Sequence, residues 1–213
     1  MAGAARVFLL SPANLGGERA TLLTSPRAAF PLATRLKSRR GAPLGEVMSF
    51  LSGLYFRGKL AYGLAFAAPP SPHCPGVMVI TPNRGLRPPH TPVTLETLRA
   101  AGRVDIHQKN ASYRRPLETT ARVLARQIGA DCEVVLLGSI ASDKYTAVLG
   151  EVFGSRLRFP IDFVGRGDMS RGGLLLRCVA AGRELPYVPL AGAVRHGPRP
   201  PRLLPLAAAV VRP

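Results

Sequence analysis

Short apolar runs alternate with helical patterns along the chain. The run Arg6–Ser11 closes on Pro12 and indicates a first buried strand. Val77–Thr81 and Glu133–Leu137 are two further apolar runs bounded by turn residues, and a strand region is expected over Leu157–Val164. Strands separated by helices predict βαβ units, and therefore an α/β fold: a single domain with a largely parallel sheet and helices on both faces.

The first half of the chain is expected to hold short helices around one loop. Gly16–Ala20 follows the first strand and predicts a loop with exposed backbone. Ala28–Leu36 is helix-like, and the long apolar segment Leu44–Phe66 indicates two short helices that break near Arg57-Gly58. A strand remains an alternative for the first of these two.

In the second half, capping residues mark the helix ends. A short helix is expected from a Thr94 cap through Ala101. Pro116 suits the first turn of a longer helix that ends at Gly129. Ser142 is expected to cap the next helix, which Gly154 ends.

Length and cysteine usage set the broad class. A chain of 213 residues suits one well-buried core, which we place over residues 1–192, followed by an Arg/Pro-rich tail over 193–213. No apolar run approaches the roughly 18–20 residues of a membrane span, so no membrane partner is expected. Cys74, Cys132 and Cys178 are scattered and predict a reducing compartment, by default the cytoplasm.

The charge changes this picture most. The formal net charge is +17, from 29 Lys+Arg against 12 Asp+Glu, and 25 of the 29 are Arg. A GC-rich genome explains the preference for Arg over Lys but does not explain the shortage of acidic residues. A field this positive attracts polyanions, so the sequence predicts a nucleic-acid or nucleotide partner.

One candidate site follows the strand that ends at Leu137. Here Gly138-Ser139 leads to the expected cap, and Ser139, Ser142 and Lys144 are predicted to bind phosphate at the start of the helix. The spacing is not that of a Walker A motif. Asp143 in the same segment is a candidate catalytic carboxylate. The alternative is an ordinary capped helix with a surface lysine.

The segment Gly165–Gly173 is the second candidate, because it combines glycines, arginines and one carboxylate. We predict a loop whose backbone approaches a phosphate closely and whose arginines hold it. Asp168 is the candidate catalytic residue there, positioned to orient a water or a hydroxyl. The predicted binding residues of this loop are Arg166, Ser170, Arg171, Gly172 and Gly173. A flexible turn without function is the alternative.

A third segment, Ser52–Lys59, interleaves aromatic and basic residues. Tyr55 or Phe56 is predicted to stack on a base while Arg57 and Lys59 contact phosphates. In the alternative, the aromatic side chains belong to the core and the charged ones face solvent.

Metal and hydrolase motifs are missing from the sequence. The four histidines have no ligand spacing with the cysteines, so neither a metal nor a cofactor is expected. No G-x-S-x-G or H-E-x-x-H motif occurs. The oligomeric state is left open.

The run Glu133–Ala141, followed by a helix and a new strand, resembles a central strand–helix segment of the uracil-DNA glycosylase superfamily. Some members of that superfamily carry a similar Leu-Gly-x-x-Ala turn, here Leu137 to Ala141. The resemblance covers about 25 of the 213 residues. The water-activating motif of the family is not recognisable at Ser11–Gly17, so no catalytic residue is carried over.

These patterns lead to three functional hypotheses. The first is an enzyme that acts on a nucleotide or on a base or phosphate ester in nucleic acid, with its site at the carboxyl ends of the strands. The second is a basic nucleic-acid-binding module without catalysis. The third is an enzyme acting on small phosphate esters. A pocket that joins Asp143, Lys144, Asp168 and Arg171 would favour an enzyme over a binding module.

Overall fold

The computed structural model describes residues 4–201 and 203. A six-stranded sheet forms its centre, in the order β4-β3-β1-β6-β7-β8. The four inner strands are parallel and the two edge strands are antiparallel to their neighbours. The strands are β1 (Arg6–Leu10), β3 (Val77–Thr81), β4 (Gly85–Arg87), β6 (Glu133–Leu137), β7 (Leu157–Pro160) and β8 (Tyr187–Pro189).

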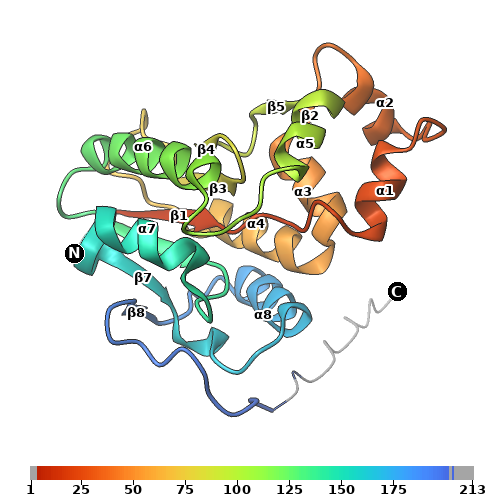
Figure 1. The fold of residues 1–213 in the computed structure, drawn as a ribbon. Coiled ribbons are helices and arrows are strands. Elements are labelled where there is room, and N and C mark those ends of the chain that lie inside the picture. The colour runs from red at the N-terminus through yellow and green to blue at the C-terminus, as the bar shows by residue number, and fades with distance from the viewer. Residues whose placement is uncertain (1–3, 202, 204–213) are drawn as a thin grey trace.

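Helices cover both faces of the sheet, which confirms the predicted single-domain α/β fold (Figure 1). Side chains of β1 alternate between the faces: Val7 and Leu9 point to one core, Phe8 and Leu10 to the other. The first core is closed by α6 (Ala111–Gln127) and α7 (Asp143–Phe153). The second is closed mainly by α3 (Leu44–Ser52), α4 (Leu54–Phe66) and α8 (Asp168–Ala180).

Four helices gather at one end of the molecule in Figure 1. They are α1 (Glu18–Thr24), α2 (Pro31–Lys37), α3 and α5 (Leu95–Gly102), and the small antiparallel pair β2 (Ala42–Pro43) and β5 (Pro92–Val93) lies among them. The predicted loop Gly16–Ala20 is therefore partly wrong, because Gly17 is the N-cap of α1 and the helix starts at Glu18.

Two of the expected helix boundaries differ from the structure. The break within Leu44–Phe66 lies at Gly53, which has a φ of 59°, a conformation that favours glycine. Gly58 is inside α4 instead. The long helix α6 begins at Ala111, where the Asn110 side chain accepts a hydrogen bond from Ser112 N, so Pro116 lies within the helix and not at its start.

Other boundaries agree with the sequence pattern. Thr94 caps α5 through a capping box with Thr97. Gly129 has a φ of 72° directly after α6, and Gly154, at 56°, ends α7. Ser142 is the N-cap residue of α7, but its side chain makes no capping hydrogen bond.

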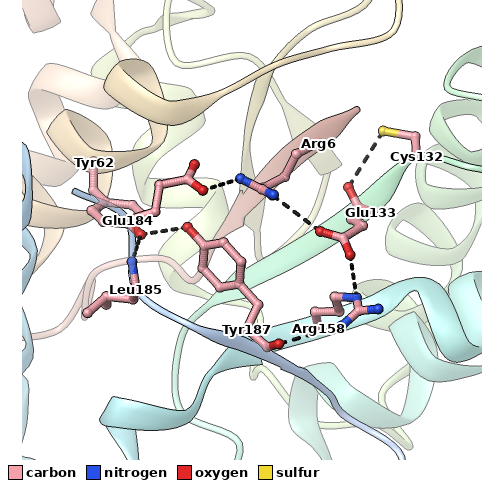
Figure 2. A network of polar contacts seen from close by, with 8 residues as sticks. All are labelled: Arg6, Tyr62, Cys132, Glu133, Arg158, Glu184, Leu185 and Tyr187. Atoms are coloured by element: carbon pink, nitrogen blue, oxygen red, sulfur yellow. Dashed lines mark hydrogen bonds and ion pairs between the residues drawn. The ribbon is translucent and has the colours of Figure 1, made fainter. Parts of the chain in front are cut away.

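The amino ends of the central strands are joined by a polar network (Figure 2). Arg6 on β1 forms ion pairs with Glu133 on β6 and with Glu184 before β8. Glu133 also pairs with Arg158 Nε on β7 at 2.8 Å. Beside them the hydroxyls of Tyr62 and Tyr187 are 2.5 Å apart, and Tyr62 Oη accepts a hydrogen bond from Leu185 N at 2.8 Å.

We expect Glu133→Ala to destabilise the fold by about 1–3 kcal/mol, because it removes the shared anion between two partly buried arginines. The matched control is Glu46→Ala, which breaks the exposed Arg35–Glu46 ion pair and is expected to cost about 0–1 kcal/mol. Urea unfolding of both variants measures the difference. Equal losses for the two variants would contradict a stabilising role for the network.

Candidate functional site

The chain leaves the two central strands toward opposite faces of the sheet. After β1 it enters α1, which packs against α2 and α3 in one core. After β6 it enters α7, which packs in the other core. Adjacent parallel strands whose loops diverge in this way leave a crevice at their carboxyl ends, and ligands of open α/β sheets bind there.

Two cavities open in this crevice. The inner cavity, of about 190 Å³, lies against the ends of β1 and β6, and the outer cavity, of about 500 Å³, extends toward Pro82 after β3. The two share Ala13, Asn14 and Lys144. The inner cavity is lined by Ser11, Pro12, Ala13, Asn14, Leu51, Ser52, Tyr55, Ser139, Lys144, Tyr145 and Asp168.

A basic groove leads to this crevice. It is a cavity of about 710 Å³ between α2 and α5, and its charged lining residues are Lys37, Arg39, Glu96, Arg99 and Arg103. Arg103 also lines the outer cavity, so the groove and the crevice have this cation in common. Four of the five charged side chains in the groove are cationic, which suits a polyanionic ligand.

Lys59 is the most unusual residue beside the crevice, because its side chain is only 1% exposed. Its Nζ donates hydrogen bonds to Ser11 O at 2.6 Å and Ser11 Oγ at 2.8 Å. Nζ also lies 4.4 Å from the centre of the Tyr55 ring. Burial lowers the pKa of Lys59 to about 7, and the negative charge of Asp168 opposes that shift.

Tyr55 lines the inner cavity and carries a buried hydroxyl. Within the described chain, Tyr55 Oη has no hydrogen-bond partner of good geometry, although the Arg171 guanidinium lies near enough to act on it as a donor. Burial raises the pKa of this hydroxyl, so it remains a neutral donor at physiological pH. An unpaired buried donor is costly unless a ligand or a water satisfies it.

The segment Gly165–Gly173, predicted to be a loop, is helical from Asp168 onward. The chain turns at Gly165, where φ is 72°, and α8 begins at Asp168 after the Gly167 N-cap. Asp168 is exposed at the inner cavity and pairs with Arg171 at 3.5 Å. The guanidinium of Arg171 is directed inward, donating to Phe163 O from Nε at 3.2 Å and Nη2 at 3.0 Å.

The rest of this segment lies elsewhere. Arg166 donates to Ser170 Oγ at 3.2 Å, and both residues line a separate cavity of about 350 Å³ with Gly173 and residues of the tail. Gly172 is buried against α4, where an added Cβ would lie 2.8 Å from Leu54 O and from Tyr55 Cα. Its role is close helix packing, not approach to a phosphate.

Three more of the predicted site residues lie outside the crevice cavities. Asp143 pairs with Arg195 of the tail at 2.5 Å, and this hydrogen bond lowers the pKa of the carboxyl group. Ser142 and Arg57 are exposed. The structure thus brings Tyr55, Ser139, Lys144 and Asp168 together in one cavity, with Lys59 beneath it.

The sequence analysis did not select Ser11, Asn14 and Tyr145, which also line the inner cavity. It predicted that Lys59 contacts phosphates, whereas the structure places the amine in the interior. One signal for this was available: Tyr55 and Lys59 are four residues apart and share a face in any helix over this segment.

Other kinds of site find little support. Among residues 4–201 and 203, no three His, Cys, Asp or Glu side chains lie close enough to hold a metal ion. None of the described helices has the length and apolar character to cross a membrane.

Comparison of the chain with protein-family models, curated proteins and solved structures finds no match.

Proposed function

We propose that this protein is an enzyme that binds a nucleotide or a single-stranded nucleic acid, with the reacting group in the inner cavity. The observation that carries the proposal is the basic groove beside the crevice, with Arg103 lining both. A chain of phosphates lying along Lys37, Arg39 and Arg99 would reach the crevice at Arg103. Lys144 then provides a cation at the inner cavity itself.

A cavity beside the basic surface favours an enzyme over a binding module. A module that only holds phosphates needs an exposed cationic face, which the groove alone provides. The inner cavity adds Ser11 and Tyr55 to its lining, and the buried amine of Lys59 lies behind Ser11. Perturbed titratable groups in a cleft are typical of catalytic sites.

We expect Lys144→Ala to weaken binding of short single-stranded oligonucleotides and of nucleotides by about tenfold, because it removes the cation shared by both cavities. The fold should persist, since the ammonium group of Lys144 forms no ion pair in the described chain. Ligand-induced shifts in melting temperature and fluorescence titration at two salt concentrations measure the effect.

Arg126→Ala is the matched control. It removes one positive charge at the end of α6, which leads to the amino edge of the sheet, opposite the crevice. Binding of oligonucleotides should weaken steeply with salt in this variant and in the wild type. Equal binding by the Lys144 and Arg126 variants would place the partner outside the crevice and support a module that uses the groove alone. No binding at low salt would overturn the proposal.

A further inference from the structure

A serine and a lysine meet at the bottom of the inner cavity. Ser11 lines the cavity at the carboxyl end of β1, and its Oγ lies 2.8 Å from Lys59 Nζ. Lys59 itself does not line the cavity and is almost fully buried. A molecule in the cavity therefore contacts the hydroxyl of Ser11, while the amine lies behind it.

Packing fixes this arrangement from both sides. Lys59 also donates to Ser11 O at 2.6 Å, and the rings of Tyr55 and Phe56 enclose the amine at 4.4 and 5.0 Å. Directly after the neighbouring strand β6, a Cβ at Gly138 would lie 2.9 Å from Ser11 Cβ and 3.0 Å from its Oγ. Only a glycine at position 138 leaves Ser11 in this place.

The charge state of Lys59 suits a base. Within the described residues no carboxylate forms an ion pair with the amine, so its charged form is costly in the interior. The charged groups that act on it from neighbouring helices are Asp168 and Arg171 on α8 and Lys144 on α7. With a pKa of about 7, a large share of the amine is neutral at physiological pH and has a free lone pair.

The presence of a lysine at position 59 also supports a role as a base. The chain contains 25 arginines and only four lysines, yet a lysine occupies the buried position. An arginine would keep its proton under all physiological conditions, whereas a lysine can release it when buried. A purely structural cation would not require that property.

We infer that Ser11 is a nucleophile and Lys59 its general base, in a site that cleaves a carboxylic ester or amide group of the bound ligand. The inference deepens the proposed function, because it rests on the crevice being the ligand site and names the reacting group. It does not depend on the nature of the remainder of the ligand.

In the first step Ser11 Oγ forms a bond to the carbonyl carbon, and its proton moves to Lys59 Nζ. The bond from that carbon to the leaving oxygen or nitrogen then breaks, and Lys59 returns the proton to the leaving group. In the second step water attacks the acyl-serine and gives a proton to Lys59. The Ser11 ester bond breaks and Oγ regains a proton, releasing a carboxylic acid.

The lining of the cavity favours a carbonyl over a phosphoryl group at Ser11. Asp168 lies in the same small cavity, where its carboxylate would repel a phosphate and offset the attraction of Lys144 for it. A carbonyl group is neutral, and its oxygen gains negative charge only during the reaction. The cation that lines this cavity, Lys144, suits an oxygen that becomes an anion.

The test is covalent labelling of the full-length protein with a fluorescent alkyl fluorophosphonate, followed by mass spectrometry to locate the label. The probe forms a bond from phosphorus to serine oxygen and loses fluoride. We expect modification of Ser11 alone, at a rate that rises with pH through about 7 as Lys59 loses its proton. A label on Ser52 or Ser139, the other serines of the cavity, would overturn the inference, as would a rate independent of pH or no labelling.

Two variants separate catalysis from structure. Lys59→Met keeps the length of the side chain and should lower the labelling rate by about 100-fold or more. Lys109→Met changes an exposed lysine and should label like the wild type. If Lys59 only braced α4 against β1, Lys59→Met would melt earlier but label Ser11 at the wild-type rate. The pH profile of the wild type provides the test even if the variant fails to fold.

Failure of this inference differs from failure of the proposed function. Ser11→Ala should abolish labelling, and nucleotide binding is measured separately, as the thermal shift of the wild-type protein. A protein that binds nucleotides through Lys144 but is never labelled has the proposed ligand site without the serine nucleophile. A protein that is labelled at Ser11 but ignores nucleotides and oligonucleotides has the nucleophile without the proposed ligand.

Discussion

Gly172→Ala is expected to destabilise the protein by about 1–3 kcal/mol, although alanine is the better helix former. Gly172 lies in α8 where this helix crosses α4, and an added Cβ would lie 2.8 Å from two backbone atoms, Leu54 O and Tyr55 Cα. Gly58 is equally close from the other side, since its Cβ would lie 2.8 Å from Gly172 O. Backbone atoms cannot rotate away, so the two helices must separate.

The next residue provides the control. Gly173 lies in the same helix, and an added Cβ there would meet only Leu203 Cδ1, at 3.6 Å, which is ordinary contact. Gly173→Ala should therefore be neutral or stabilise by about 0.5–1 kcal/mol, through helix propensity alone. Urea unfolding of the two variants measures the difference in stability. Thermal unfolding should show the same difference, as a shift of roughly 2–4 °C in melting temperature for each kcal/mol. Destabilisation of equal size at both positions would show that the close crossing is unimportant.

This crossing explains why the glycines after Val164 gave a wrong prediction of a loop. Glycine is rare in helix interiors because it costs stability there, so a glycine-rich segment indicates a loop. The rule does not hold where the backbones of two helices are in direct contact, as they are at Gly58 of α4 and Gly172 of α8. The partner of each is more than 100 residues away in the sequence, so no local pattern could reveal it.

The strands were predicted well because their signal is local. Buried parallel strands consist of continuous apolar runs, and β1, β3 and β6 all lie within the expected segments. Helix boundaries were less accurate where one signal competed with another. Gly53 and Gly58 are both candidates for a break, and only the positive φ at Gly53 separates them.

The candidate site was predicted in part. The rule that ligands bind at the carboxyl ends of strands directed attention to the loops after Leu10, Ile80, Leu137 and Val164. Ser139, Lys144 and Asp168, which follow the last two of these, do meet in the inner cavity. The position of Lys59 was missed, because lysine is a surface residue in most proteins. Its burial follows from the helix-to-strand contact between α4 and the end of β1, which sequence spacing alone does not determine.

The second large effect is a pH-dependent stability that belongs to Lys59. The pKa of a lysine in an unfolded chain is 10.5, and that of Lys59 in the folded protein is about 7. Between these values the unfolded state holds one more proton than the folded state, so stability rises with pH, at up to about 1.4 kcal/mol per pH unit. We expect the wild type to gain about 2–3 kcal/mol over Lys59→Met between pH 7.5 and 9.5.

The comparison must be a difference between two proteins because other groups titrate nearby. Burial raises the pKa of five tyrosines, whose contribution to stability is complete below pH 10 and lost above it. These tyrosines are present in both proteins and cancel in the difference, as they do in the exposed-lysine control Lys109→Met. Urea unfolding at half-unit steps of pH gives the two curves.

A constant difference between wild type and Lys59→Met would mean that Lys59 keeps its ordinary pKa in the folded protein. The amine would then be charged at physiological pH, with no lone pair to accept the proton of Ser11. A rising difference shows instead that the interior holds a neutral amine 2.8 Å from the serine hydroxyl. The stability curve thus tests the base independently of any substrate, because the charge state of Lys59 is a property of the folded protein alone.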